Sequence, residues 1–397
     1  MNEKKKLQPK VRFREFTGEN APDWEQRKLG ELSEIVRGAS PRPIQDPKWF
    51  DESSDIGWLR ISDVTNQNGR VHFLEQKISK LAQEKTRVLE TPHLLLSIAA
   101  SVGKPVINYT KTGVHDGFLI FINPKFDLYF MFQWLEMFKP IWQKYGQPGS
   151  QVNLNSDIVK NHKINIPSDH EQEHIGQFFE KIDKLITLHQ RKLEQLEQLK
   201  NTLLSKMFPK SGTNIPEIRF SGFTDAWKQR KLGEVVIRLD NLRIPITESN
   251  RVSGPTPYYG ANGIQDYVEG YTHDGEYILI AEDGANDTNN YPIFRVHGKI
   301  WVNNHAHVLQ TIDDIADNDY VAYALKSINI GPYLVGGSRS KLNADSLMKL
   351  EIKLPKLSEQ IKVGQIFVKI DYQIKNYKQK LKNLKTIKKS LLNKLFI

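Results

Sequence analysis

One segment of this chain occurs twice, and this repeat limits the possible folds more than any other feature. Residues 167–208 align without a gap to residues 355–396, and 18 of the 42 aligned positions are identical. Upstream, a Trp-x5-Gly motif recurs as WEQRKLG at 24–30 and as WKQRKLG at 227–233. Repetition of this extent predicts two halves of common architecture, related by a pseudo-two-fold axis.

The segments between the repeated parts differ. Residues 31–148 and 234–336 have almost no identity when they are aligned with each other. Both are typical of mixed α/β bodies with loops rich in Gly, Asn and Pro. Strands are expected at 94–98, 118–123, 277–281 and 299–303, and helices at 129–145 and 319–328. We call the repeated segments the frame and the differing segments between them the two bodies. A chain organised in this way keeps one scaffold and varies what its bodies recognise.

Each repeated segment is predicted to be a long helix with one narrow apolar face. Apolar residues recur every three or four positions, no proline interrupts them, and Pro167 and Pro355 precede them. A helix of this length extends roughly 50–55 Å at about 1.5 Å per residue. The expected seam residues are Ile175, Phe179, Ile182, Ile186, Leu193, Leu196 and Leu203 in the first copy, and Val363, Phe367, Ile370, Ile374, Leu381, Leu384 and Leu391 in the second.

An apolar seam of this length must be buried. Its expected partner is the other copy, packed antiparallel as a coiled coil, and the alternative is that each helix packs on its own α/β body. The predicted fold is therefore mixed α/β, with two globular domains joined by two long helices. The predicted boundaries are 1–168 for the first domain, 169–209 for the central helix, 210–356 for the second domain and 357–397 for the C-terminal helix.

The charge balance favours a polyanionic partner. The formal net charge is +10, and nucleic acid is the commonest partner of such a chain. The absence of cysteine excludes disulfides, cysteine-based metal sites and a cysteine nucleophile. No apolar stretch follows the N-terminal lysines, and the longest apolar run, near 94–100, is far shorter than the ~20 residues of a membrane span. A cytoplasmic location without a membrane partner is expected.

The loops of both bodies hold side chains suited to base edges and phosphates. Arg and Lys pair with guanine, and Asn and Gln with adenine, in the major groove. For each residue alone, the alternative is an ordinary surface polar group. Lysine is also dense on the second helix, where a solvated face, DNA phosphate and an acidic partner all stay open. The candidate DNA-binding residues are Arg37, Arg42, Arg60, Lys104, Gln147 and Gln151 in the first body, and Arg243, Asn262, Gln265, Asn286, Arg339 and Lys341 in the second.

A possible zinc motif disappears when the two halves are compared. HEQEH at 170–174 fits the H-E-x-x-H pattern, with His170 and His174 as ligands. The aligned SEQIK at 358–362 keeps the Glu-Gln pair and loses both histidines. We interpret the Glu-Gln pair as structural.

Other catalytic patterns are incomplete. His305 and His307 alternate on a predicted strand without a third metal ligand. Glu351-Ile352-Lys353 matches the end of a PD-(D/E)xK nuclease motif, but no Pro-Asp precedes it at a suitable distance, and we interpret it as a surface strand. The sequence has neither a P-loop nor the tetrapeptide of amino-methyltransferases. We therefore predict no catalytic residue and no metal.

The ordered set of motifs resembles the specificity subunit of type I restriction-modification enzymes. The resemblance is carried by the two Trp-x5-Gly motifs, by Pro-x3-Glu-Gln at 167–172 and 355–360, and by the Leu-rich helices that follow. PYYGANGI at 257–264 and YILIAEDG at 277–284 also resemble segments of this family's recognition domains. The resemblance covers nearly the whole chain.

The resemblance implies a non-catalytic DNA-binding subunit of a complex that acts as restriction endonuclease and adenine-N6 DNA methyltransferase. Each body would recognise one half of a bipartite site in double-stranded DNA. The helices would set the gap between the halves and dock two methylation subunits, which two restriction subunits join. This chain would bind no cofactor, since S-adenosylmethionine, Mg²⁺ and ATP are used by the partner subunits. The alternatives are a stand-alone two-headed DNA-binding regulator and a metallohydrolase that uses His170 and His174, which the repeat disfavours.

Overall fold

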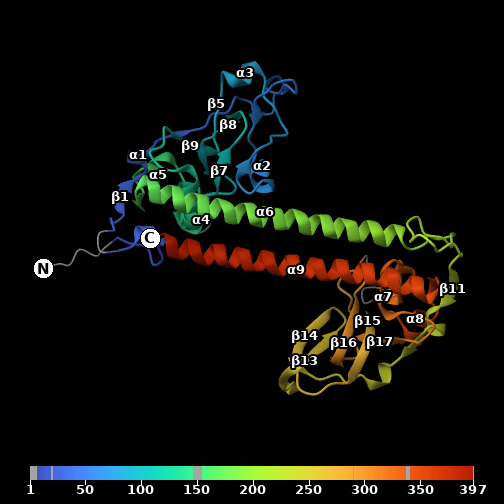
Figure 1. Ribbon diagram of the computed structural model, residues 1–397. Helices are drawn as coiled ribbons and strands as arrows, with labels where there is room; N and C mark the ends of the chain where they lie inside the picture. Colours follow the sequence, from blue (N-terminus) through green and yellow to red (C-terminus); the bar gives the residue numbers. More distant parts are fainter. Residues whose placement is uncertain (1–6, 19–20, 146–153, 289, 337–339, 397) are drawn as a thin grey trace. The chain divides into compact units, whose positions relative to one another are not determined.

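Figure 1 presents the computed structural model, in which two mixed α/β domains are connected by two long helices. This confirms the predicted fold class. The structure describes residues 7–18, 21–145, 154–288, 290–336 and 340–396. In this part of the chain, no helix is long and apolar enough to cross a membrane.

The chain divides into two compact units. Unit 1 contains residues 1–189 and 380–397, and unit 2 contains residues 190–379. The long helices are shared between the units, because α6 (Asp169–Lys206) begins in unit 1 and ends in unit 2, whereas α9 (Leu357–Leu395) does the reverse. We call the α/β part of unit 1 domain one and that of unit 2 domain two.

Domain one is built on a five-stranded sheet of order β2-β9-β6-β7-β4 and a three-stranded sheet of order β3-β8-β5. Its strands and helices are β1 (Glu25–Lys28), α1 (Leu29–Leu32), β2 (Glu34–Arg37), β3 (Gly57–Trp58), α2 (Ile61–Asn66), β4 (Arg70–Val71), α3 (Lys80–Gln83), β5 (Arg87–Leu89), β6 (Leu94–Ser97), β7 (Pro105–Asn108), β8 (Thr112–Val114), β9 (Phe118–Ile122), α4 (Leu128–Trp142), α5 (Ser156–Asn161) and β10 (Lys163–Ile166). The expected helix 129–145 is α-helical only to Trp142 and ends in a 3-10 turn.

Domain two is built on a six-stranded sheet of order β12-β17-β15-β16-β13-β14. Its strands and helices are β11 (Lys228–Lys231), β12 (Val236–Arg238), β13 (Ser253–Gly260), β14 (Gly263–Val268), β15 (His273–Ala281), β16 (Ile293–Val302), β17 (Ala306–Thr311), α7 (Asn318–Lys326), α8 (Ala344–Met348) and β18 (Glu351–Leu354). As predicted, residues 351–353 lie in a strand, β18, which pairs antiparallel with β11.

The Glu-Gln pair at the start of each long helix is structural in both halves. Glu171 binds the guanidinium of Arg12 through both carboxylate oxygens at 2.7 Å. Gln172 donates to the Pro167 carbonyl at 2.9 Å and accepts from the Asp127 amide at 3.0 Å. Buried amides and carboxylates must be satisfied in this way, so the pair fixes the helix start against the domain.

Unit 2 repeats this arrangement. Arg219 binds both oxygens of Glu359 at 2.8 Å, and Gln360 donates to the Pro355 carbonyl and accepts from the Asp317 amide, both at 3.0 Å. The repeated sequence therefore makes the same contacts twice.

The recurring glycine of the repeat allows a close helix contact. A Cβ on Gly176 would lie 2.4 Å from Asp127 Oδ1, and a Cβ on Gly364 would lie 2.9 Å from Asp317 Oδ1. These two aspartates cap the N-termini of α4 and α7. A larger residue would push each domain away from its long helix.

The phenylalanine that follows each long helix lies in the domain opposite to the one where that helix starts. Phe208, just after α6, packs near Trp227 and Tyr320 of domain two, with ring centroids 6.3 and 5.5 Å away. Phe396, just after α9, packs in the same way near Trp24 and Phe130 of domain one, at 6.5 and 5.2 Å. Each α/β domain is thus completed by a residue from the other half of the sequence.

Within each unit, the segments of α6 and α9 run antiparallel. In unit 1, Asp183 of α6 lies 2.6 Å from Lys388 near the end of α9. In unit 2, Lys200 near the end of α6 lies 2.6 Å from Asp371. A continuous coiled coil through both units stays a prediction.

Burial along the predicted seam is uneven. Its early residues also pack into the core of their own domain, as Ile175 and Phe179 do in domain one. Both packing alternatives considered for the helices therefore contribute. Buried seam residues are Ile175, Phe179, Ile182, Leu193, Leu196, Val363, Phe367, Ile370, Ile374 and Leu381, and half-buried ones are Ile186, Leu203, Leu384 and Leu391.

Candidate nucleic-acid interface

The main sheets of the two domains share a four-stranded core. Strands β2, β9, β6 and β7 follow the same order and antiparallel pairing as β12, β17, β15 and β16. The loops that follow β2 and β6 and precede β9 are therefore equivalent to those that follow β12 and β15 and precede β17. We call these loops the strand-end loops of each domain.

In domain one, the structure brings two of the predicted arginines together. Arg37 Nε donates to the Asp116 carbonyl oxygen at 2.6 Å, and Arg42 Nη2 lies 2.8 Å from Asp116 Oδ2. Burial raises the pKa of Asp116, but the hydrogen bond from Ser40 and the nearby arginines hold that pKa below its usual value. The side chain of Arg42 is 72% exposed, so this cationic group is accessible to an anionic ligand.

The other predicted residues of the first body do not join this cluster. Arg60 forms ion pairs with Asp63 and Glu75, and these raise its pKa. Lys104 lies 2.5 Å from Glu136 of α4. Gln147 and Gln151 lie outside the described residues.

In domain two, three predicted amide residues interconnect the loops. Asn262, in the turn between β13 and β14, donates to the Gly284 carbonyl at 2.9 Å and accepts from the Asn286 amide at 3.0 Å. Gln265 accepts from Asn303 at 3.4 Å. Because these contacts link the β13–β14 hairpin, which carries Asn262 and Gln265, to the segments after β15 and before β17, the three residues lie in one cluster.

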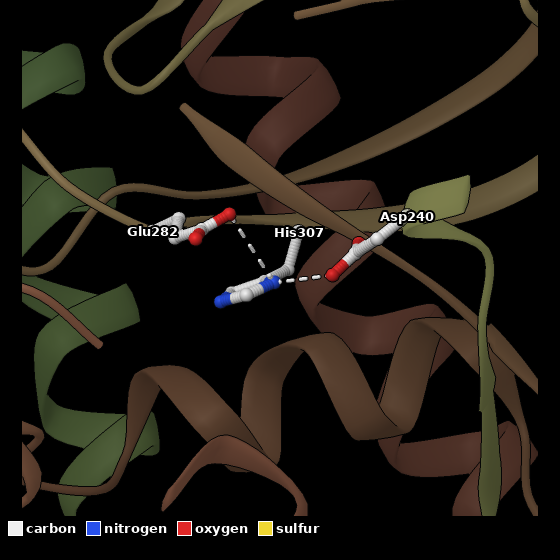
Figure 2. Close-up of side chains that lie close together, drawn as sticks. All are labelled: Asp240, Glu282 and His307. Atoms are coloured by element: carbon white, nitrogen blue, oxygen red, sulfur yellow. Dashed lines mark hydrogen bonds and ion pairs between the residues drawn. The ribbon is translucent and has the colours of Figure 1, made fainter. Parts of the chain in front are cut away.

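A charged network lies at the base of the same loops (Figure 2). Nδ1 of His307 lies 2.6 Å from Asp240 Oδ2 and 3.8 Å from Glu282 Oε2. Its Nε2 lies 2.8 Å from the Leu342 carbonyl oxygen. The side chain of His307 is 1% exposed, so both of its contacts are shielded from solvent.

Two predicted cations belong to this network. Arg243 donates to Glu282 Oε2 at 2.6 Å and to the carbonyls of Asp240 and Ala306 at 3.0 and 2.9 Å. Lys341 lies 2.8 Å from Glu282 Oε1, and its side chain is 44% exposed. Arg243 is thus engaged internally, whereas Lys341 reaches the surface. Arg339 lies outside the described residues.

The cations keep the two carboxyl groups ionised. Burial raises the pKa of Asp240, but hydrogen bonds from His307 and the Val308 amide, and the charges of His307 and Arg243, lower it below the usual value. Burial likewise raises the pKa of Glu282, and hydrogen bonds from Lys341 and Arg243 reverse that shift. Both groups are therefore anionic at neutral pH.

Asp240, Glu282 and His307 form the one group of three potential metal ligands within the described ranges. Their donor atoms already bind Arg243, Lys341 and the Val308 amide. A metal ion would have to displace these cations, so we interpret the group as an ion-pair network. Glu171, the glutamate of the H-E-x-x-H pattern, is bound by Arg12, as expected for a structural residue.

At least two of the many lysines on α9 form ion pairs within the units. Lys388 lies 2.6 Å from Asp183, and Lys378 lies 2.8 Å from Glu197. For these two lysines, the structure shows an ion-pair role within the frame.

The sequence reasoning missed the acidic residues of both loop clusters. Asp116, Asp240 and Glu282 organise the cations, but the pairs Arg42–Asp116, Asp240–His307 and Arg243–Glu282 are 74, 67 and 39 positions apart in the chain. The positions of two network residues in the sequence could have indicated them. Glu282 directly follows the buried strand β15, and His307 is the buried member of the alternating histidine pair.

The comparisons with known proteins give one family. Residues 22–198 and 224–386 match the model of the type I restriction modification DNA specificity domain. The chain is 43% identical over 157 residues to a type I restriction enzyme specificity subunit of Haemophilus influenzae, a match that spans 40% of each chain. It is 24% identical over 358 residues, or 83% of each chain, to the specificity subunit of the type I restriction enzyme EcoprrI of Escherichia coli.

A solved structure has a similar fold. The S subunit of a type I restriction-modification system from M. genitalium superimposes with a TM-score of 0.72, over 98% of this chain and 99% of that chain. Its sequence identity is 15%. The likeness therefore concerns the fold.

Proposed function

The chain belongs to the family of type I restriction-modification DNA specificity subunits, and on that premise we propose that its strand-end loops contact the DNA bases. As a member of this family it is a non-catalytic DNA-recognition subunit, with two recognition domains for a bipartite site. Domain one would recognise one half of the site and domain two the other.

The observation that carries the proposal is the equivalence of the two loop clusters. The repeated frame presents the same strand ends in both domains, and predicted DNA-binding residues gather there in each. In domain one these are Arg37 and Arg42. In domain two Asn286 lies in the loop after β15, and Asn262 of the β13–β14 turn and Lys341 contact that loop. Arg and Asn side chains suit guanine and adenine edges, respectively. Arg60 lies outside these loops, and Lys104 lies in the loop after β6 but pairs with Glu136 of α4, so both are weaker candidates.

Type I specificity subunits assemble with methylation and restriction subunits. We infer that two methylation subunits dock on the long helices of this chain and that two restriction subunits join them. The support is the pseudo-two-fold repeat, because two near-identical helices offer two equivalent docking surfaces. S-adenosylmethionine, Mg²⁺ and ATP would act in those partners. A stand-alone regulator gains no support from the family match.

Methylome sequencing tests this function. The gene is deleted and then restored, and methylated adenines are mapped in both strains. We expect a bipartite motif that disappears with the gene, and a pull-down that recovers a methyltransferase in about two copies per chain. An unchanged methylome, with specific DNA binding by the isolated chain and no recovered methyltransferase, would favour the regulator instead.

A further inference from the structure

Domain two carries its charged network at three positions whose equivalents in domain one are small and uncharged. The strand registers pair Arg37 with Leu119 in one sheet and Arg238 with Leu309 in the other. The equivalent positions are counted from these pairs, together with the pairing of β6 with β9 and of β15 with β17. The equivalents of Asp240, His307 and Glu282 are then Ala39, Gly117 and Ala100, in that order. The network is therefore absent from the repeated frame and special to domain two.

The network fastens separate chain segments to one another. Asp240 follows β12, Glu282 follows β15 and His307 lies in β17. The Glu282 amide donates to the His305 carbonyl at 2.9 Å, and the Leu342 amide donates to the Glu282 carbonyl at 2.7 Å. The segment that carries Lys341 is thereby held against the ends of three strands.

His307 is the central connection. Its two ring nitrogens both face oxygens that only accept hydrogen bonds, the Asp240 carboxylate and the Leu342 carbonyl. The two contacts measure 2.6 and 2.8 Å and are shielded from solvent, where hydrogen bonds are strong, so the loops that carry Asp240 and Leu342 have little freedom.

We propose that the Asp240–His307–Glu282 network positions the loops of domain two and thereby determines the specificity of its half-site. The three residues are positioning residues and not base contacts, since His307 is buried, the Asp240 side chain is only 10% exposed, and Glu282 faces Arg243 and Lys341. The inference rests on the proposed function. Its consequence is asymmetric, because loosening this network should affect one half of the recognised site and leave the half read by domain one.

The test uses the full-length chain, expressed with its methylation partner in cells that lack the native gene. Asp240→Asn and His307→Gln are introduced separately, because both nearly keep side-chain size and remove the charged contact. Leu325→Ala is the matched control, since Leu325 is fully buried in α7 and is not a member of the network. The methylated motif of each strain is read base by base.

We expect both network variants to keep the first half-site and to accept substitutions in the second. The loss of one well-placed bidentate side-chain–base pair corresponds to roughly 5- to 150-fold in discrimination, so preference for the wild-type second half-site should fall by about that factor. Leu325→Ala should lower methylation evenly and leave the motif unchanged. If the network variants behave like Leu325→Ala, the proposal is wrong.

Two further outcomes are distinguishable. If Asp240→Asn and His307→Gln yield no folded complex, Glu282→Gln carries the test, because its amide keeps the shape of the carboxylate, and the same two motif outcomes decide. If the wild-type chain itself gives no bipartite motif, the proposed function fails before the network is tested.

Discussion

The two α/β domains make the same contacts with the long helices and differ in their strand-end loops. In both units an Arg–Glu pair, a framing tryptophan and an aromatic residue from the end of the other long helix make the same contacts. At the strand-end loops, domain two has Asp240 and Glu282 where domain one has Ala39 and Ala100. The comparison teaches that the frame fixes where the loops lie, and the loops alone decide what surface they present.

If the two frames are equivalent, one half of the chain should pair with a second copy of itself. A fragment of residues 1–210 contains Phe208 but lacks Phe396, which completes domain one in the full chain. Phe208 of a second copy can fill that place, because the two residues occupy the same position of the repeat. We expect light scattering to give twice the fragment mass and, with the methylation partner, a palindromic methylated site.

The unpaired fragment would expose Ile182, Ile186, Leu193 and Leu196, so its folding must be verified by circular dichroism. A folded fragment that stays monomeric at micromolar concentration would contradict the equivalence of the two frames.

Removing one partner of the buried Arg–Glu pair should have the next largest effect. It should lower the free energy of unfolding equally in both units. Glu171 and Glu359 are 0% and 1% exposed, and each is bound by an arginine. Removing one partner leaves a buried charge uncompensated, so Glu171→Ala and Glu359→Ala should each lower the free energy of unfolding by about 3–5 kcal/mol. Denaturant unfolding measures the loss, and hydrogen exchange shows which unit opens. A large loss of unfolding free energy for only one of the two variants would contradict the equivalence of the two units.

The smallest difference lies at equivalent positions of α4 and α7. Glu136 forms an ion pair with Lys104, whereas burial, and then the charge of Lys200, lower the pKa of Lys326 to about 8. The pKa of an unfolded lysine is ~10.4. Lys326 therefore costs stability below pH 8, and the cost disappears as the pH rises to ~10.4, where the unfolded chain also loses the proton.

Lys326→Met should raise the free energy of unfolding by about 1 kcal/mol at pH 7 and flatten its rise above pH 8. Denaturant unfolding at several pH values checks this. The matched variant Glu136→Gln should instead lose up to about 1 kcal/mol, because its ion pair is half-buried. Equal signs for the two variants would contradict the assigned environments.

The frame could be predicted from the sequence because the repeat provides an internal comparison. The recurrence of the Glu-Gln pair without the histidines excluded the zinc interpretation, and Arg12 bound to Glu171 explains why the pair recurs. The spacing of apolar residues predicted both long helices, although it could not tell that Ile175 also packs into the core of domain one.

The recognition loops could be predicted only by residue type. Residue type marks Arg60 and Lys104 as cations, but Arg60 pairs with Asp63, three positions away, and with Glu75. Lys104 pairs with Glu136, which the tertiary fold brings near. The network of Asp240 and His307 joins residues that are 67 positions apart. No local pattern reports such a pair, because the register of β12 against β17 creates it.

The most direct test of the account exchanges one domain's variable segment. Residues 31–148 are replaced by the equivalent segment of another specificity subunit, and the repeated frame is left intact. If each domain reads its own half-site, methylome sequencing should show a new first half-site, an unchanged second half-site and the same gap. A change in both half-sites together would contradict the claim that the two domains recognise DNA independently.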